Sequence, residues 1–427
     1  MPPARTVRLV ALAGALVVAA CGQGDSSPDE AADTTAVETS TTAASAAESL
    51  PESLPVLRPA TGDLGARAII AGVVAVPGGF LAIGERLSDD AGGGDIQTVT
   101  TFWRSPDGHD WTMSDADPAV WGAWTADRVA QGPAGIVVLA GGDNGRAMLA
   151  SVDGETWTVT PIAADSLGLP ADTFPGAFPI NDVAAVDGGF LALGQLVGGS
   201  GGATEVEPLL LFSPDGVTWQ RATGPALAPT AVPPEYFAGA ARLGGTTVIF
   251  VTADQGFAVS VWRSTDSVTW EPIGGTELFG GVDRVVLAAA TDFDGRLVAA
   301  GHDHTSGAAA VWTSDDGEQW TLLSGDGLTG PGRYAPKVFT SVPGELLMIG
   351  TREPGSDGSM TGTVWASTDG EVWRRAEPDD APVTGRVDVV GAASDGADVA
   401  VVGTQYPAAI DLATVQMNAW WVEQVDG

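Results

Sequence analysis

The feature that most constrains this chain is a seven-residue pattern, S-x-D-G-x-x-W, that occurs six times at nearly even intervals. The copies begin at Ser105, Ser151, Ser213, Ser264, Ser314 and Ser367. Their last residues, Trp111, Trp157, Trp219, Trp270, Trp320 and Trp373, are 46, 62, 51, 50 and 53 residues apart. A period of about 50 residues is typical of solenoids, propellers and other arrays. The chain is therefore expected to fold as a series of similar units.

Each copy predicts a hairpin. A short apolar strand comes before it, and these strands are predicted at residues 101–104, 148–150, 209–212, 259–263, 310–313 and 364–366. The Asp-Gly pair supplies the positive φ that a tight turn needs, and the Ser and Asp oxygens can accept hydrogen bonds from the turn amides. The tryptophan opens the next strand and can bury about 150–250 Å². In the fourth copy Ser267 replaces the glycine, which is expected to cost about 1 kcal/mol if the turn is kept.

A second pattern alternates with the first and occurs seven times: a strand of small residues, a turn with glycine, and an apolar strand that often ends in glycine. Its copies lie at residues 73–84, 129–141, 183–194, 240–252, 287–301, 338–350 and 389–403. Two hairpins in about 50 residues make a four-stranded propeller blade. We therefore predict an all-β fold, a seven-bladed β-propeller of four-stranded antiparallel blades. The segment 54–58 is expected to close the ring as the outer strand of the seventh blade, whose third strand is predicted at residues 419–422.

The first 53 residues indicate export and anchoring. Arg5 and Arg8 come before an apolar run at residues 9–20, as in a signal peptide. Residues 18–21 (VAAC) resemble the bacterial lipobox, which implies that Cys21, the only cysteine, is lipidated; the alternative is an ordinary cleaved signal. We predict a lipoprotein signal peptide at 1–20, a disordered acidic tether rich in Ser, Thr and Ala at 21–53, and the propeller at 54–427. The protein is then extracytoplasmic and anchored to the bacterial cell membrane.

The charge balance excludes one class of partner. The chain has 19 Lys and Arg against 54 Asp and Glu, a formal net charge of −35. Nucleic-acid binding depends on neutralising phosphates with basic side chains, so a nucleic-acid partner is not expected. We expect a monomer without a cofactor.

The turn pattern resembles the Asp-box of bacterial-neuraminidase-repeat proteins, whose usual form, S-x-D-x-G-x-x-W, is one residue longer. This resemblance implies blade architecture and a structural role for the box aspartates, Asp107, Asp153, Asp215, Asp266, Asp316 and Asp369. The sialidases of this superfamily use a tyrosine nucleophile and an F/Y-R-I-P motif. No such motif occurs here, and the tyrosines are Tyr236, Tyr334 and Tyr406. The resemblance thus implies the fold and leaves catalysis open.

Candidate binding residues lie in the loops of unequal length on one face of the predicted ring. Basic residues shortly before the first strands form a predicted ring near the central mouth, which could hold a carboxylate or another anion: Arg67, Arg128, Arg284, Arg333, Lys337 and Arg386. Pairing with nearby acids such as Asp127 and Asp283 is the alternative. The aromatic residues Trp121, Trp124, Tyr236 and Tyr334 could stack on sugars or anchor a protein; the alternative is a small core beneath the loops.

His302 and His304 lie on one side of an extended segment, as in some metal sites, but no third ligand is identified, so no metal site is predicted. The expected function is recognition of a protein or a cell-envelope glycan on the variable-loop face, without catalysis. The alternatives are a glycoside hydrolase of sialidase-like or related type, and a purely structural envelope protein.

Overall fold

A computed structural model describes residues 53–65, 67–89, 96–142, 145–163, 180–198, 205–230, 232–282, 284–353, 360–375, 386–406 and 416–426. They belong to one compact unit, Ser53–Gly427. The unit is all-β: besides strands, the described residues form α1 (Pro118–Trp121) and the short 3-10 turns η2 (Pro225–Leu227), η3 (Asp254–Gly256) and η4 (Thr276–Leu278). None of the helices in these ranges is long and apolar enough to cross a bilayer.

Among the described residues, four of the six sheets have four antiparallel strands, and in three of these the strands follow chain order. One contains β7 (Thr125–Gly132), β8 (Gly135–Gly142), β9 (Gly145–Ser151) and β10 (Thr158–Ile162). The next contains β11 (Ile180–Val186), β12 (Gly189–Gly198), β13 (Glu205–Ser213) and β14 (Gln220–Arg221). Another contains β23 (Arg333–Val342), β24 (Glu345–Glu353), β25 (Thr361–Ser367) and β26 (Arg374–Arg375). The propeller-like pattern of consecutive hairpins is thus present in the structure.

The two other sheets have five and eight strands. In the first, β3 (Ala68–Val76), β4 (Gly79–Asp89), β5 (Ile96–Ser105) and β6 (Asp110–Asp115) are joined by β2 (Thr61–Gly62), which runs parallel to β6. The second has eight strands: β15 (Tyr236–Leu243), β16 (Thr246–Ala253), β17 (Ala258–Ser264), β18 (Glu271–Gly275), β19 (Val285–Phe293), β20 (Arg296–Asp303), β21 (Ala309–Ser314) and β22 (Thr321–Leu322). Its two halves meet at one parallel pair, Gly239 and Ala290. A Cβ at Gly239 would lie 2.0 Å from the Ala290 oxygen, so only glycine allows this approach.

The first and last strands of the unit share a sheet. β1 (Ser53–Pro59) pairs antiparallel with β29 (Gln416–Asp426). On its other side β29 pairs with β28 (Val399–Tyr406), and β28 pairs with β27 (Arg386–Ser394). Leu57 of β1 also reaches the neighbouring sheet, since its Cδ1 lies 2.6 Å from where a Cβ of Gly362 would be. The N-terminal strand therefore contacts two sheets.

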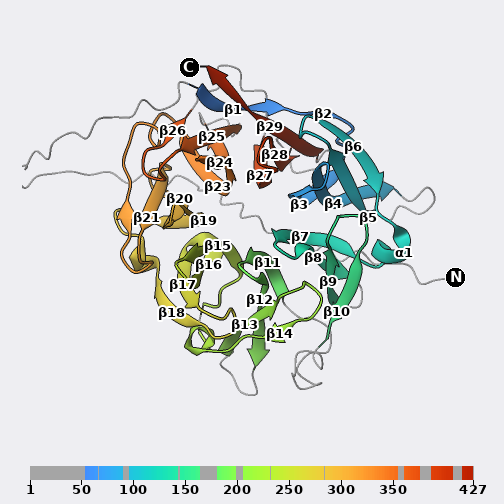
Figure 1. Cartoon of the computed structure of the whole chain (residues 1–427), viewed down its shortest axis with the longest axis horizontal. Helices are drawn as coiled ribbons and strands as arrows, with labels where there is room; N and C mark the ends of the chain where they lie inside the picture. Colours follow the sequence, from blue (N-terminus) through green and yellow to red (C-terminus); the bar gives the residue numbers. More distant parts are fainter. Residues whose placement is uncertain are drawn as a thin grey trace, which may run out of the picture. The chain divides into compact units, whose positions relative to one another are not determined.

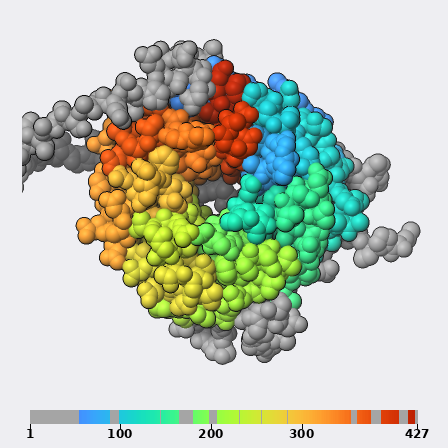
Figure 2. Space-filling view, viewed as in Figure 1, coloured from blue at the N-terminus to red at the C-terminus, as the bar shows by residue number. Residues whose placement is uncertain are grey.

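Seven strands lie innermost and form a cycle in which each contacts the next: β3, β7, β11, β15, β19, β23 and β27. The cycle closes because β27 contacts β3. Within the unit the sheets are thus arranged in a ring around a central opening (Figure 1). The space-filling view shows the hollow at its centre (Figure 2). The core lies between neighbouring sheets; one cluster combines Leu81, Ile83 and Phe102 with Val138 and Leu149.

Each of these inner strands, in the part of the chain described, has a β-bulge at the same height. The extra residues are Ala71, Asp127, Asn181, Ala238, Ala288, Lys337 and Val390. The partner strand often has glycine here, because a Cβ at Gly84 or Gly301 would lie 2.2 or 2.0 Å from a carbonyl oxygen of the inner strand. This close approach is the physical reason for the glycine that ends the second sequence pattern. Bulges turn side chains to new directions and are frequent next to functional sites.

The S-x-D-G-x-x-W turns have the predicted geometry. In the first copy the Ser105 hydroxyl accepts a hydrogen bond from Gly108 N (2.8 Å), and Asp107 Oδ1 accepts one from His109 N (2.9 Å). The turn glycines have positive φ, from 74° at Gly216 to 81° at Gly108, and Ser267 keeps the same turn with φ 60°. The hydrogen bonds to Thr269 N and Val268 N hold the pKa of Asp266 down at about 2. The turn carboxylates are therefore engaged by their own backbone.

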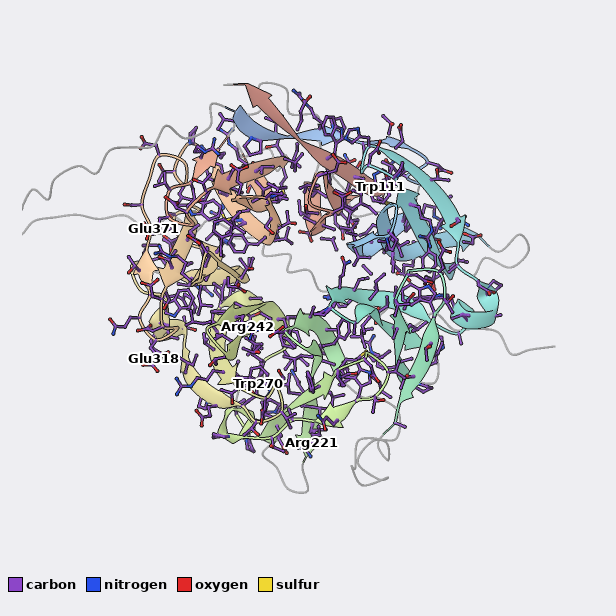
Figure 3. All side chains as sticks on the ribbon, in the orientation of Figure 1. Trp111, Arg221, Arg242, Trp270, Glu318 and Glu371 are labelled. Carbon is purple, nitrogen blue, oxygen red and sulfur yellow. The ribbon has the colours of Figure 1, made fainter. Side chains whose placement is uncertain are left out.

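Consecutive turns are linked at the outside of the ring. Arg263, which precedes the fourth turn, pairs with Glu318 of the fifth at 3.1 Å, and Arg296 pairs with Glu371. Figure 3 labels Glu318 and Glu371 near the outer edge, and Trp111 and Trp270 within their sheets. Trp111 and Trp270 are almost completely buried. The turns thus contribute to the packing of one sheet on the next.

Candidate functional site

One group of polar side chains lies where three neighbouring inner strands begin. Asp127 and Arg128 are at the bulge of β7, Asp182 is at the bulge of β11, and Tyr236 opens β15. Arg146 joins them from β9. We call these five residues the arginine–tyrosine cluster. Because the inner strands pack side by side in the same direction, their first residues share one face of the ring.

Asp182 holds the cluster together. Its carboxylate accepts hydrogen bonds from Val183 N (2.9 Å) and from Phe237 N of β15 (2.9 Å), and it lies 3.6 Å from Arg128 Nε of β7. One buried side chain therefore connects three strands. Burial raises the pKa of Asp182 to about 6, although Arg128 and the two amides favour the ionised form.

The other charges of the cluster pair locally. Arg146 forms an ion pair with Asp127, and a guanidinium nitrogen of Arg128 donates to the Asp127 carbonyl oxygen at 2.8 Å. Burial lowers the pKa of Arg146 from its ordinary value. The Arg128 guanidinium carbon lies 5.6 Å from the centre of the Tyr236 ring, and Tyr236 is 39% exposed. An exposed aromatic ring beside a fixed guanidinium offers both a stacking surface and hydrogen-bond donors.

The other predicted aromatic residues lie deeper. Trp121 is buried and makes edge contacts with Phe102 and Trp157, at ring distances of 5.5 and 5.2 Å. Tyr334 is also buried, and its hydroxyl donates to the Pro331 oxygen at 3.2 Å. Trp124 is half-buried. Trp121 and Tyr334 thus present no exposed ring, which agrees with the alternative of a small core beneath the loops.

The predicted basic residues are in different situations. Arg67 is half-buried with φ 60° just before β3, and Lys337 pairs with Asp388 at 3.1 Å. Arg284 and Arg333 are exposed. The side chain of Arg386 and all of Cys21 lie outside the described residues. The structure therefore brings Arg128 and Tyr236 together but does not place all of these residues in one contact group.

His302 and His304 lie at the end of β20. Burial, with the positive charges of Lys337 and Arg333, lowers the pKa of His302 to about 4. Among the described residues no three His, Cys, Asp or Glu side chains gather closely enough to hold a metal ion.

Sequence reasoning did not select Asp182 or Arg146. Asp182 is a charged residue just before an apolar strand, and this is the only local signal it gives. Its importance depends on Phe237, which is 55 residues away in the chain.

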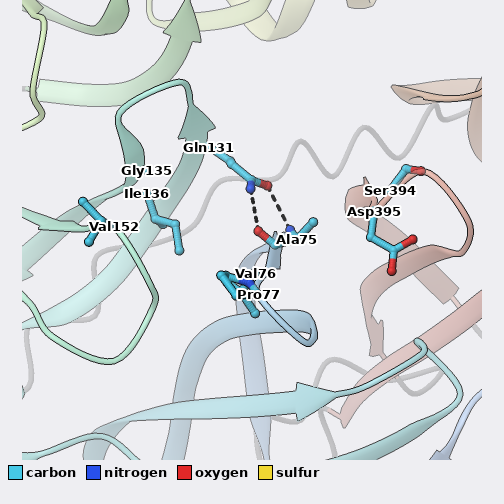
Figure 4. Close-up of a pocket in the computed structure, with 9 residues that line it drawn as sticks. All are labelled: Ala75, Val76, Pro77, Gln131, Gly135, Ile136, Val152, Ser394 and Asp395. Atoms are coloured by element: carbon cyan, nitrogen blue, oxygen red, sulfur yellow. Dashed lines mark hydrogen bonds between the residues drawn. The ribbon is translucent and has the colours of Figure 1, made fainter.

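A shallow hollow of about 410 Å³ lies at the opposite ends of the inner strands (Figure 4). The Gln131 side chain in it is bound to the backbone of Ala75 through both its oxygen and its nitrogen. Asp395 accepts hydrogen bonds from Ala397 N and Asp398 N, which lower its pKa. Within the described part of the chain no aromatic ring lines this hollow, whereas the arginine–tyrosine cluster has the exposed ring of Tyr236, so the cluster is the better candidate for a site.

Comparisons with known proteins do not assign this chain to a family. No protein-family model matches the chain, and no curated protein matches it in sequence. One similar solved structure is a puromycin hydrolase mutant, with 14% sequence identity and a TM-score of 0.48; the match covers 79% of this chain and 50% of that one. Another is the phage phi92 endosialidase, with 10% identity and a TM-score of 0.44; the match covers 87% of this chain and 70% of that one. A third is a Bombyx mori GH32 beta-fructofuranosidase, with 14% identity and a TM-score of 0.35; the match covers 58% of this chain and 60% of that one. The chain spans half the length of the puromycin hydrolase. Likeness at this level says nothing about activity.

Proposed function

We propose that this protein is a lipid-anchored, extracytoplasmic binding module, and that its arginine–tyrosine cluster recognises a cell-envelope glycan. The observation that carries the proposal is the exposed ring of Tyr236 beside Arg128. Sugars are recognised by stacking on aromatic rings and by hydrogen bonds to their hydroxyl groups, and this pair supplies both. Asp182 contacts Arg128 and the Phe237 amide next to Tyr236, so the backbone at Tyr236 and the Arg128 side chain are held in place before binding.

The scaffold we propose is a seven-bladed propeller closed by the N-terminal strand. Two observations support it: the bulged inner strands form a cycle in which β27 packs on β3, and β1 pairs with β29. Such closure removes free sheet edges that would otherwise pair with other chains.

Membrane attachment rests on the sequence alone, through Cys21 and the apolar run before it. One test is labelling of producing cells with a fatty-acid analogue. Wild-type protein should be labelled and sediment with membranes, and Cys21→Ser should lose both properties. A labelled Cys21→Ser protein would refute lipidation at this residue.

Glycan binding is tested with the full chain in detergent on an array of envelope glycans. Tyr236→Phe keeps the ring and should bind normally, whereas Tyr236→Ala should lose most binding while melting at the same temperature. Equal binding by Tyr236→Ala would refute the site. If no glycan binds but a purified envelope protein does, the partner is a protein instead.

The second candidate is a glycoside hydrolase, and the Asp182 pKa, raised to about 6, favours it, because a general acid must hold its proton near neutral pH. Against it, the Asp182 carboxylate is occupied by Arg128 and two amides. Release of cleaved sugar that is lost in Asp182→Asn would establish hydrolysis and replace the binding role.

A further inference from the structure

Two exposed arginines lie at the start of later inner strands, away from the arginine–tyrosine cluster. Arg284 comes directly before β19, and Arg333 opens β23. Among the residues that the structure describes, no carboxylate forms an ion pair with either of them, although eleven other basic side chains of this acidic unit do so. Asp283, the acid next to Arg284 in the sequence, is outside the described residues.

Both guanidinium groups are held in place by uncharged partners. The Arg284 guanidinium carbon lies 3.9 Å from the centre of the Phe257 ring, which makes an edge contact with the His304 ring at 5.1 Å. Arg333 donates from one terminal nitrogen to the His304 oxygen at 3.0 Å, and His304 N donates to the Arg284 oxygen at 2.8 Å. The segment around His304 thus links the two arginines.

Two basic side chains, Lys337 and Arg333, lie near His302, next to this segment. His302 is two residues from His304, and its buried Nδ1 has no hydrogen-bond partner within the described part of the chain. The charges of Lys337 and Arg333 contribute to the lowered pKa of His302, after burial. Asp303, the acid between the two histidines, turns back on its own loop, where it accepts hydrogen bonds from Thr305 N and the Ser306 hydroxyl. The Arg284 backbone also donates a hydrogen bond to this carboxylate, so Asp303 lies beside the two arginines with its oxygens occupied by local donors.

We propose that Arg284 and Arg333 form a site for a tetrahedral oxyanion, a phosphate or sulfate group carried by the ligand. This proposal rests on the function proposed above and adds a ligand class to it, an anionic glycan. The two oxygens of a planar carboxylate can both be hydrogen-bonded by a single guanidinium group. A phosphate or sulfate group has three free oxygens and can accept hydrogen bonds from two guanidinium groups that come from separate strands. The stacking on Phe257 keeps the Arg284 fork in place before an anion arrives.

The test uses calorimetric titration of the full chain with sodium phosphate, sodium sulfate and sodium acetate at constant ionic strength. Phosphate or sulfate should bind in a saturable way, and acetate should bind at least about tenfold more weakly. Arg284→Gln and Arg333→Gln should each weaken oxyanion binding about tenfold or more, as expected for loss of a hydrogen bond between charged groups. Arg263→Gln is the matched control, with the same charge change on the outer side, and should stay within about twofold of wild type.

Phe257→Leu is a second variant, which keeps every charge. It should weaken oxyanion binding about threefold, the effect of losing an exposed cation–π contact. A preference for phosphate points to a phosphorylated glycan, and a preference for sulfate to a sulfated one.

The proposal is overturned if neither ion binds, if Arg284→Gln behaves like Arg263→Gln, or if acetate binds as tightly as phosphate. These outcomes are separable from failure of the proposed function. Neutral glycans that bind through Tyr236 while no oxyanion binds would refute only the oxyanion site. Saturable phosphate binding without any glycan binding would refute only the glycan role.

Discussion

Replacing Asp182 by asparagine should change how the stability of this protein depends on pH. The carboxyl group is buried among β7, β11 and β15, and its pKa in the folded protein is about 6, against about 3.9 for an aspartate in an unfolded chain. A folded-state pKa above the unfolded one means that the folded protein holds the proton more tightly. The favourable contribution is complete below pH about 4 and is lost as the pH rises through about 6.

The size of the effect follows from the pKa difference of about 2 units. Each unit corresponds to about 1.4 kcal/mol, so ionisation of Asp182 lowers the free energy of unfolding by about 3 kcal/mol between pH 4 and 7. Asparagine has no proton to lose. The free energy of unfolding of Asp182→Asn minus that of wild type should therefore rise by about 3 kcal/mol from pH 4 to 7. Loss of the Arg128 contact lowers the stability of the variant by an amount that does not depend on pH, so it does not change this rise.

The assay is denaturant unfolding of both proteins at several pH values from 4 to 7, followed by tryptophan fluorescence. Asp266→Asn is a control whose difference from wild type should stay nearly constant from pH 4 to 7, because the Asp266 pKa is lowered to about 2 and its stabilisation is lost mainly below pH 4. A difference between Asp182→Asn and wild type that does not vary with pH would contradict the argument. A difference that moved the other way would mean that pairing with Arg128 outweighs burial.

Three further predictions concern the scaffold. Asp215→Ala removes the acceptor for Val217 N and Thr218 N, so urea unfolding should show a loss of about 1–2 kcal/mol, and an unchanged midpoint would contradict the role of the turn. Ser267→Gly relieves a serine at φ 60°, so the same measurement should show a gain of about 0.5–1 kcal/mol, and a loss would mean that the serine side chain stabilises this turn. Removal of residues 53–59 frees the edge of β29, so calorimetry should show melting at least about 5 °C lower, with aggregation in light scattering; equal melting would show that β1 is dispensable.

Local features of the fold could be predicted from the sequence because their causes are local. A turn that needs positive φ selects Asp-Gly, and a strand that faces a bulge selects glycine at positions such as Gly301. The site could not be predicted in the same way. Asp182 becomes important only because Phe237 N and Arg128 meet it from two other strands, and no pattern within one repeat unit records this.

The aromatic residues show the same limit. Both Trp121 and Tyr236 are candidate exposed rings in the sequence, and in the structure Trp121 ends α1 whereas Tyr236 opens β15. Their exposure, 3% against 39%, is decided by whether Phe102 and Trp157 are present to cover the ring.

The bulge at equal height in every described inner strand has a consequence for how such a protein can change. The extra residues include alanine, valine, asparagine, aspartate and lysine, so these positions accept very different chemistry. The ladder continues on either side of the bulge, although Ala71, Ala238 and Val390 also contact the packed clusters between sheets. The polar bulge residues Asp127, Asn181 and Lys337 are thus the positions in this ring where a change of side chain alters the chemistry around the opening with the least change to the packed core.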